Sequence, residues 1–292
     1  MLNFAIVGCG RIANKIVDGI ISNSKKAKLV AICDILEDKM DQIEKRYIEK
    51  TNIKNEIVKN SNYKELLGKV KVDVVIVSTE SGYHEEIGLY FLENRVNVII
   101  EKPIAMSIQG AQKLVDKAKE KKLKLAACHQ NRFNYPIQLL KKAIQENRLG
   151  KIFNGMARIL WTRDDNYYLQ APWRGTWALD GGTLMNQCIH NIDLINWMMD
   201  DEIDTVYSQT SNYIRNIEAE DYGVIIIRYK SGKIATIEGS AIIYPKNLEE
   251  TLTVTGEKGT VVIGGMAVNK INTWRVEGDN EEEYLSIDCG DP

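Results

Sequence analysis

Hydrophobic residues in the first 127 positions occur in two alternating arrangements. Short continuous apolar runs are separated by longer stretches in which apolar residues recur every three or four positions, as on one face of a helix. The short runs, each mostly but not entirely apolar, are residues 3–7, 28–33, 72–79, 96–100 and 123–128. Buried strands that alternate with amphipathic helices predict a parallel sheet covered by helices on both faces. The first 127 residues are therefore expected to form an α/β domain.

The pattern changes from residue 128 onward. A helical segment within residues 131–152 is followed by extended stretches rich in β-branched residues. These stretches are residues 152–161, 204–213, 221–230, 233–244, 250–257 and 259–265. Turn signals at 231–232 and 257–259 favour antiparallel pairing. We expect residues 128–292 to form an α+β domain with a large, mostly antiparallel open sheet, whose free face binds further copies in a homodimer or homotetramer.

A glycine turn joins the first predicted strand to the first predicted helix. It runs Gly8-x-Gly10-Arg11-Ile12-Ala13. The first glycine permits the tight turn, the second lets the backbone approach a pyrophosphate, and the small alanine lets helix and strand pack closely. Free N–H groups at the start of the helix also favour phosphates. In this strand–turn–helix setting, the motif predicts that residues 1–127 are a dinucleotide-binding (Rossmann) domain.

Asp34, at the end of the second predicted strand, indicates which dinucleotide is bound. An acidic side chain about 20 residues beyond the glycine turn binds the hydroxyls of the adenosine ribose. Ile35 and Leu36 follow it, so no Arg, Ser or Thr is available there for a 2′-phosphate. We therefore expect NAD rather than NADP. In the alternative interpretation, Asp34 only caps the next helix.

Two later loops are expected to line the cofactor crevice, because ligands of such sheets bind at the carboxyl ends of the strands. The first loop begins at Ser78 and Thr79 and reaches His84, and the second carries Glu101 and Lys102. All five are candidate cofactor-binding residues, together with the residues of the glycine turn and Asp34.

Composition and charge exclude several classes of protein. The chain is 44% hydrophobic and 27% charged with a formal net charge of −2, and no aromatic residues are interleaved with its basic clusters. It has no apolar run of about 18 residues and no targeting leader. We expect a cytoplasmic protein that binds neither nucleic acid nor membranes. Five cysteines without a CxxC pair and only three histidines predict reduced thiols and no metal site.

Residues 180–200 place a histidine in an otherwise apolar predicted helix. With a start near Gly182 and about 100° per residue, Asn186, His190, Asp193 and Trp197 fall in one narrow stripe. A helix that is apolar nearly all round is buried, so the polar stripe must be hydrogen-bonded or line a site. His190 is therefore a candidate proton acceptor. Alternatively it is a structural histidine, satisfied by Asp193 or a backbone carbonyl.

Three motifs in order produce a resemblance to a known family. The glycine turn, the segment EKPIA at residues 101–105 and the segment GGTLMNQCIHNIDLINWMM at residues 181–199 resemble the glucose–fructose oxidoreductase/inositol dehydrogenase (Gfo/Idh/MocA) family over essentially the whole chain. The resemblance implies that Lys102 and His190 are active-site residues. Asn186 stands where the family usually has a carboxylate.

The run from Arg163 to Met199, which includes WRGTW at residues 173–177, is similar to one subgroup, the UDP-N-acetylglucosaminuronate 3-dehydrogenases. That subgroup supplies precursors of bacterial surface polysaccharides and carries Asn at the position of Asn186. Family members usually continue into a further C-terminal helix that packs on the nucleotide domain. This helix is expected to be absent here, because the chain ends at residue 292.

These motifs together suggest a reaction. Oxidation of a secondary alcohol needs a hydride acceptor and a base, and histidine suits the second role near neutral pH. We expect His190 to take the proton, Lys102 to polarise and position the hydroxyl, and Asn186 to orient the sugar. Arg163, Tyr168 and Arg174, in a segment rich in aromatic residues, are candidate ligands of an anionic nucleotide sugar. Alternatively, these aromatic residues belong to the core, and Lys102 is a lysine in a turn.

The predicted function is NAD-dependent oxidation of the C3 hydroxyl of a UDP-N-acetylglucosaminuronate-type sugar. Two alternatives remain open from sequence: a dehydrogenase of a free sugar or inositol that uses the same lysine and histidine, and a non-catalytic NAD(H)-binding sensor. Affinity for UDP separates the first two, and substrate-dependent reduction of NAD separates both enzymes from the sensor.

Overall fold

The computed structural model describes residues 1–52 and 56–290, and its contacts divide the chain into two compact units. The first unit consists of Met1–Cys128 and Ala178–Asp180, and the second of His129–Trp177 and Gly181–Pro292. A short segment from the second half of the sequence thus packs with the first unit.

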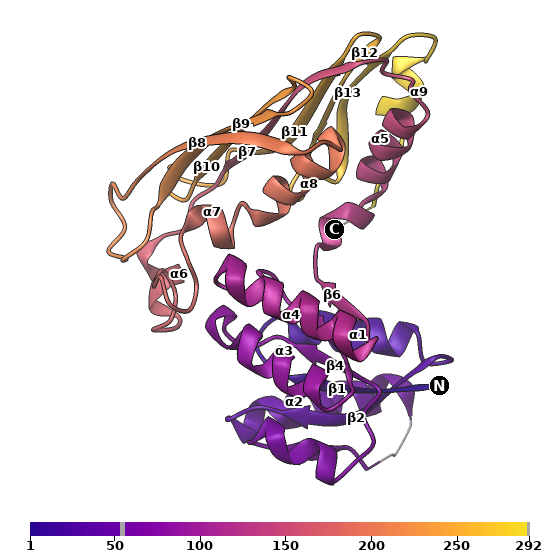
Figure 1. Ribbon diagram of the computed structural model, residues 1–292, viewed down its shortest axis with the longest axis vertical. Helices are drawn as coiled ribbons and strands as arrows, with labels where there is room; N and C mark the ends of the chain where they lie inside the picture. The colour runs from indigo at the N-terminus through magenta and orange to yellow at the C-terminus, as the bar shows by residue number, and fades with distance from the viewer. Residues whose placement is uncertain (53–55, 291–292) are drawn as a thin grey trace. The chain divides into compact units, whose positions relative to one another are not determined.

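The first unit is built around a six-stranded parallel sheet with strand order β3-β2-β1-β4-β5-β6 (Figure 1). Its strands are β1 (Leu2–Val7), β2 (Ala27–Cys33), β3 (Val58–Asn60), β4 (Val74–Val77), β5 (Asn97–Ile100) and β6 (Leu125–Ala127). The predicted parallel sheet is confirmed. The strand order reverses between β1 and β4, and dinucleotides bind beyond the carboxyl ends of the strands at such a point.

Helices cover both faces of this sheet, as the apolar periodicity predicts. They are α1 (Ala13–Ser22), α2 (Glu37–Thr51), α3 (His84–Glu93) and α4 (Ile108–Lys121), with 3₁₀ helices η1 (Tyr63–Gly68) and η2 (Ser81–Tyr83). Helices α1 and α2 pack on the face that carries Ile6 and Leu29, whereas α3 and α4 pack on the opposite face with Val75 and Val77. Alternate residues of each strand thus serve two separate cores.

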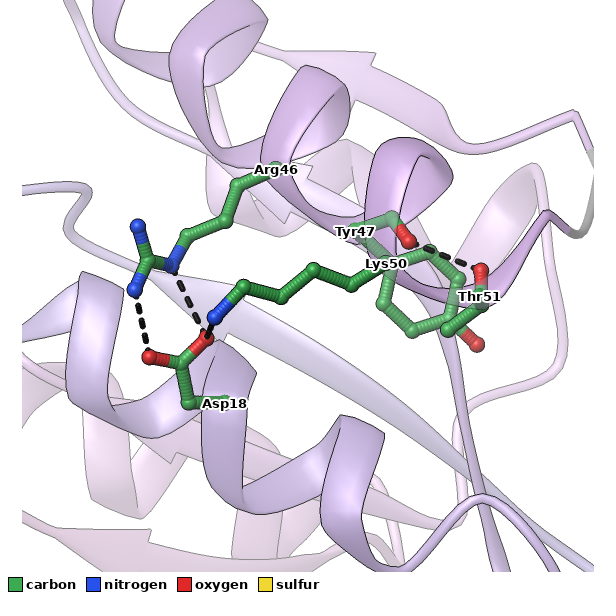
Figure 2. Close-up of polar contacts among 5 residues, drawn as sticks. All are labelled: Asp18, Arg46, Tyr47, Lys50 and Thr51. Carbon is green, nitrogen blue, oxygen red and sulfur yellow. Dashed lines mark hydrogen bonds and ion pairs between the residues drawn. The ribbon is translucent and has the colours of Figure 1, made fainter.

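Polar contacts at the surface tie α1 to α2 (Figure 2). The Asp18 carboxylate on α1 accepts hydrogen bonds from Arg46 Nε and Lys50 Nζ on α2, each at 2.9 Å. These bonds, the one from Arg46 most of all, lower the pKa of Asp18 to about 2. In the last turn of α2, Thr51 Oγ1 donates to the carbonyl oxygen of Tyr47 at 2.7 Å. Because these charges are exposed, the ion pairs add little to the stability of the protein. Their main effect is on the orientation of α1, which follows the glycine turn.

The second unit contains a seven-stranded sheet with strand order β13-β12-β11-β7-β10-β9-β8 (Figure 1). Its strands are β7 (Ile152–Leu160), β8 (Ile203–Ser211), β9 (Tyr222–Tyr229), β10 (Ile234–Ser240), β11 (Glu249–Gly256), β12 (Gly259–Gly264) and β13 (Lys270–Val276). Only β7 and β10 pair in parallel. The large, mostly antiparallel sheet is therefore confirmed, including the hairpins β9–β10 and β11–β12 at the two predicted turns.

The helices of the second unit are η3 (Gln130–Phe133), α5 (Tyr135–Gln145), α6 (Asp165–Leu169), α7 (Thr183–Asn186), α8 (Ile189–Met199) and α9 (Glu281–Leu285). Helices α5, α7, α8 and α9 pack against strands of the sheet, whereas α6 lies beyond the end of the sheet (Figure 1). Helix α8 can lie close to the strands because Gly155 and Gly239 have no side chain. A Cβ at Gly155 would lie 2.4 Å from Ile195, and a Cβ at Gly239 would lie 2.5 Å from the Cys188 sulfur. Over the described ranges, no helix is long and apolar enough to span a membrane.

Two features of the second unit differ from the sequence-based expectations. The helix expected to run unbroken through residues 183–199 is interrupted after Asn186, because Cys188 N bonds back five residues to Thr183 O and shifts the hydrogen-bond register. Asn186 and His190 therefore lie on separate helices rather than on one stripe. Strand β13 was not predicted, because two consecutive polar residues, Asn272 and Thr273, interrupt the alternation of its apolar positions.

Candidate active site

The glycine turn of the first unit has the geometry that its sequence predicts. Gly8 lies at φ +96°, and its N–H donates to the Cys33 carbonyl oxygen at 2.8 Å. A Cβ at this position would lie 2.5 Å from the backbone carbon of Ser78, so no larger residue fits. The tight turn therefore depends on a glycine at residue 8.

The remainder of the turn leaves room for a phosphate group. A Cβ built on Gly10 meets no described atom within 4 Å, so packing does not require this glycine. Ala13 is fully buried at the start of α1, where it lets the helix approach β1. Ile12 is the N-cap residue of α1, and no side chain in the described part of the chain caps this helix. An open backbone turn before an uncapped helix start fits the pyrophosphate of a dinucleotide.

We expect Gly8→Ala and Gly10→Ala to have different effects. Alanine at residue 8 combines a backbone clash with a positive φ, which by itself costs about 1–3 kcal/mol, so the melting temperature falls. Alanine at residue 10 leaves the melting temperature unchanged but occupies the open turn, so the Kd for NADH rises about 10-fold or more. Thermal unfolding and NADH fluorescence titration measure the two effects. Unchanged NADH affinity in Gly10→Ala would place the phosphates elsewhere.

Asp34 follows β2 and binds the backbone of the same turn. Its Oδ2 accepts a hydrogen bond from Cys9 N at 2.6 Å, and its Oδ1 accepts one from Leu36 N at 2.9 Å. Helix α2 has Leu36 as its N-cap residue without a side-chain cap, so Asp34 does not cap that helix. A carboxylate has about four acceptor positions, which leaves capacity for ribose hydroxyls.

The first predicted cofactor loop is hydrogen-bonded to the glycine turn, and the second follows β5 and is hydrogen-bonded to the end of β4. Ser78 is buried, and its hydroxyl donates to the carbonyl oxygen of Gly8 at 2.7 Å. His84 is buried as well, with one ring nitrogen 3.1 Å from the Thr79 carbonyl oxygen. In the second loop, the Glu101 carboxylate accepts from the Lys102 backbone N–H at 3.2 Å, and the bond from Lys102 to Pro103 is cis. The structure thus brings the candidate cofactor residues together at the carboxyl ends of β1, β4 and β5.

His190 lies near the start of α8 in the second unit. The Gln130 amide nitrogen lies 3.3 Å from His190 Nε2, and the His129 ring contacts the His190 ring edge-on with centroids 5.7 Å apart. When the Gln130 amide donates in this contact, His190 Nε2 accepts and the ring carries its proton on Nδ1, so the Nε2 lone pair points at Gln130. To act as a general base, Nε2 must exchange the Gln130 amide for the hydroxyl of a substrate.

Asp193 is bound by an arginine. Arg132 donates from Nε and Nη2 to the two carboxylate oxygens of Asp193, each at 2.6 Å, and its guanidinium lies 4.9 Å from the Trp197 ring centroid. Asp193 also lies 3.7 Å from His129 Nδ1. This bidentate pair joins η3 to α8 and so holds Gln130 beside His190.

The predicted arginines form a layered stack with aromatic rings. Arg163 lies 4.6 Å from the centroid of Trp161 and 5.2 Å from that of Tyr167. Arg174 lies 4.2 Å from the Tyr167 centroid and 4.6 Å from that of Trp173. Tyr167 therefore lies between the two guanidinium groups. Arg163 Nη1 donates to the Thr162 carbonyl oxygen at 2.8 Å and Arg174 Nη1 donates to the Tyr167 hydroxyl at 2.5 Å. The remaining N–H groups are left for other acceptors.

Gln187 connects this stack to the predicted catalytic helix. Its Oε1 accepts from Arg163 Nε at 3.1 Å, and its Nε2 donates to the Tyr167 hydroxyl at 2.9 Å and to Asn186 Oδ1 at 3.1 Å. Tyr168 completes the group, with its ring edge-on to Tyr167 at 5.1 Å. Arg163, Tyr168, Arg174 and Asn186 thus lie in one cluster.

The stack carries positive charge on two half-buried arginines, and the acid on which the charge of Arg163 acts is the buried Glu250. Within residues 1–52 and 56–290, neither Arg163 nor Arg174 forms an ion pair, and Arg174 Nε is buried without a hydrogen-bond partner. Buried charge without a partner is costly. The cluster is therefore suited to an anionic ligand.

A buried acid, Glu250, lies beneath helix α8. Glu250 on β11 is 4% exposed beside the fully buried Asn191. Burial raises the pKa of Glu250 to about 7, against the smaller opposing effects of the Asn191 side chain and the Arg163 charge. The residue next to His190 therefore packs against a carboxyl group that changes charge near neutral pH.

We expect Glu250→Gln to remove a pH dependence of stability. The pKa of Glu250 is higher in the folded protein than its ordinary value of 4.5, so its contribution to stability is complete below pH 4.5 and is lost as the pH rises to about 7. The loss amounts to roughly 2–3 kcal/mol. Urea unfolding across this interval should show wild type losing stability relative to the variant. A constant difference between the two proteins would contradict the burial of this charge.

The sequence missed several residues of these clusters. Gln130 and Gln187 were not predicted, because neutral amides have no periodicity or motif that would have indicated them, whereas Tyr167 belongs to the aromatic segment expected around Arg163 and Arg174. Among the described residues, no group of three or more His, Cys, Asp or Glu side chains could hold a metal ion.

Comparisons with known proteins agree with this geometry. A profile of an oxidoreductase family with an NAD-binding Rossmann fold (GFO/IDH/MocA) matches residues 2–129, and one of the GFO/IDH/MocA C-terminal domain matches residues 137–262. The WlbA dehydrogenase of Chromobacterium violaceum, solved with NADH and UDP-GlcNAcA, is 35% identical with a TM-score of 0.89 and coverage of 97% of this chain and 81% of its own. For the Bordetella pertussis WlbA dehydrogenase, solved with the same ligands, the identity is 34%, the TM-score 0.88 and the coverage 96% and 81%. Myo-inositol 2-dehydrogenase of Thermotoga maritima is 24% identical over 97% of this chain and 81% of its own.

Proposed function

Because this chain belongs to the GFO/IDH/MocA family of oxidoreductases, we propose that it oxidises the C3 hydroxyl of a UDP-N-acetylglucosaminuronate-type sugar to the 3-keto sugar. It is an NAD-dependent oxidoreductase of sugars or polyols. The narrower substrate is the proposal, and we place the reaction in the synthesis of surface-polysaccharide precursors.

The guanidinium–aromatic stack carries this proposal. A free sugar or inositol is neutral and gives two guanidinium groups nothing to neutralise. A uronate attached to a diphosphate has a carboxylate and phosphate oxygens, which pair well with the edges of Arg163 and Arg174. The WlbA dehydrogenases, solved with UDP-GlcNAcA, support the same substrate class.

In the proposed mechanism, three residues of this chain act on the sugar. His190 Nε2 accepts the hydroxyl proton once the substrate hydroxyl replaces the Gln130 amide beside that nitrogen. Lys102 donates a hydrogen bond to the oxygen as negative charge develops there. Asn186, held by Gln187, orients the sugar through its amide.

The glycine turn, Asp34 and the loops at Ser78 and Glu101 are proposed to hold the dinucleotide, and the open turn at Gly10 fits its pyrophosphate. Bound NAD⁺ supplies the acceptor for the hydride that leaves the oxidised carbon. The chain's own residues then need only bind, orient and accept a proton.

Mass spectrometry of candidate substrates incubated with the protein and NAD⁺ tests the function. We expect UDP-N-acetylglucosaminuronate to give a product lighter by two hydrogens, and neither UDP-N-acetylglucosamine, which lacks the carboxylate, nor free sugars to react comparably. Arg174→Met should raise KM for the nucleotide sugar by about 10–100-fold, because a charged hydrogen bond contributes about 1.5–3 kcal/mol, and should leave NADH affinity unchanged. A variant with unaltered KM would remove the arginine stack from the substrate site.

A dehydrogenase of a free polyol is the second candidate. The similarity to myo-inositol 2-dehydrogenase favours it. Oxidation of inositols by the wild-type protein, together with no reaction of the nucleotide sugar, would establish this function instead.

We also propose that the protein is a homodimer or homotetramer assembled through the sheet of the second unit. The helices that pack against this sheet occupy one of its faces (Figure 1), and Phe153, Met156 and Ile226 are exposed on its strands. The edge strand β8 is exposed along nearly its whole length. Exposed apolar strands of this kind need a partner surface, and sedimentation analysis measures the assembly.

A further inference from the structure

His84 occupies an unusual position in the first unit. It is the first residue of α3 and is 1% exposed, so its ring has no surface for a ligand. Its Nδ1 lies 2.7 Å from the carbonyl oxygen of Pro103, and its Nε2 lies 3.1 Å from that of Thr79. One ring thus contacts the backbone of the two loops that follow β4 and β5.

Each of these loops also has a backbone attachment. In the lysine loop, Glu101 N donates to the Val77 carbonyl oxygen at the end of β4 at 2.9 Å. The Thr79 loop is anchored through Ser78, whose N–H donates to Val7 O at 2.8 Å and whose hydroxyl donates to Gly8 O at 2.7 Å. The Pro103 carbonyl belongs to the residue directly after Lys102. His84 therefore connects the lysine loop to the part of the unit that carries the glycine turn.

The protonation of the ring decides which contact is a donated hydrogen bond. Burial is the largest effect on His84 and lowers its pKa, while the two carbonyls and Glu101 raise it and Lys102 lowers it. A neutral ring has one N–H, and we assign it to Nδ1 because the Pro103 oxygen is the nearer acceptor. The hydrogen bond that a neutral ring can donate thus goes to the lysine loop.

We propose that His84 is a positioning residue, which holds the backbone at Pro103 and thereby sets the placement of Lys102. This inference assumes the role of Lys102 in the proposed function. It assigns His84 to the loop rather than to direct contact with the cofactor. A displacement of about 1 Å in a positioned group costs about 10²-fold in rate, so loss of this hydrogen bond should appear in kcat.

Two substitutions separate the hydrogen bond from the bulk of the ring. In His84→Asn, the side-chain amide can occupy the place of Nδ1 and still donate to Pro103 O. In His84→Leu, a side chain of similar size has no donor. We expect His84→Leu to lower kcat about 10²-fold with the Kd for NADH changed less than about 3-fold, and His84→Asn to keep most of the turnover. If the Asn variant is as impaired as the Leu variant, or if kcat falls in neither, the proposal is wrong.

A second measurement needs no substrate. Competitive acetylation of lysines over a range of pH, followed by mass spectrometry of the peptide with Lys102, reports the environment of its amino group. We expect Lys102 to keep its wild-type reactivity profile in His84→Asn and to become more like the exposed Lys113 in His84→Leu. Phe91→Leu, a core change on the same helix, lowers stability without touching either loop and should leave the profile unchanged.

These outcomes separate the two hypotheses. A wild-type protein that fails to oxidise the nucleotide sugar, but whose Lys102 reactivity depends on the donor at residue 84, refutes the substrate and supports the positioning role. Lys102 reactivity identical in wild type and His84→Leu overturns the positioning role, whatever the substrate. A profile altered equally by Phe91→Leu also overturns it, because the effect would then be one of stability alone.

Discussion

Replacing His190 with Asn is expected to lower kcat by about 10²–10⁴-fold, the usual contribution of a positioned general base. Asparagine keeps a polar side chain beside Gln130 but cannot accept and hold the proton of the sugar hydroxyl. Steady-state kcat at saturating substrate and NAD⁺ measures the loss. The Kd for NADH should be unchanged, since the glycine turn and Asp34 are untouched.

The dependence of kcat/KM on pH is a more specific test of His190→Asn than kcat alone. In wild type, kcat/KM falls on the acid side as the base becomes protonated, and this limb should disappear in His190→Asn. His129→Asn is the matched control, because His129 contacts both the His190 ring and Asp193. An equal loss of kcat in both variants, with the acid limb retained in His190→Asn, would mean that His190 is not the base.

Replacing Lys102 with Met is expected to lower kcat by about 10²–10³-fold. Methionine is similar in length to lysine but removes the positive charge and the N–H donors that stabilise the developing alkoxide. The melting temperature should change little, because the backbone bond from Lys102 N to Glu101 remains. Single-turnover NADH formation isolates the chemical step from product release.

Lys113→Met is the control for this charge. Lys113 is an exposed lysine of α4 that pairs with Glu85 at 3.0 Å, so its replacement should leave kcat at the wild-type value. If Lys102→Met raised KM without lowering kcat, the lysine would bind substrate and transition state equally, and its proposed role in the reaction would be wrong.

The first unit could be predicted closely because its signals are local. Most of its strands and helices have a characteristic apolar period, and the glycine turn needs no distant partner to be recognised. The short strand β3 was not predicted, because its three residues form no apolar run. The structure supplies the reason for the motif: Gly8 lies at positive φ against the backbone of Ser78. Asp34 was expected to bind the ribose, but its hydrogen bond to Cys9 N depends on the register of β1 against β2 and could not be foreseen.

The second unit was predicted less completely because its important contacts join distant parts of the sequence. The expected stripe of Asn186 and His190 assumed an unbroken helix, whereas a single displaced hydrogen bond at Cys188 separates them. Gln130 lies 60 positions from His190, and no local pattern predicts that approach. Glu250 belongs to a strand of ordinary alternation, and its raised pKa arises only from burial beneath α8.

The sequence by itself determined the fold classes of the two halves, the glycine turn, the expectation of NAD and the family, because hydrophobic period and short motifs are encoded by neighbouring residues. Only the tertiary structure decided how the candidate residues are held. In the folded chain, Tyr167 contacts two guanidinium groups, the Gln130 amide contacts His190 Nε2, and the ring of His84 contacts the carbonyl oxygens of two loops. These arrangements depend on strand register and helix packing, which bring together side chains that the sequence keeps far apart.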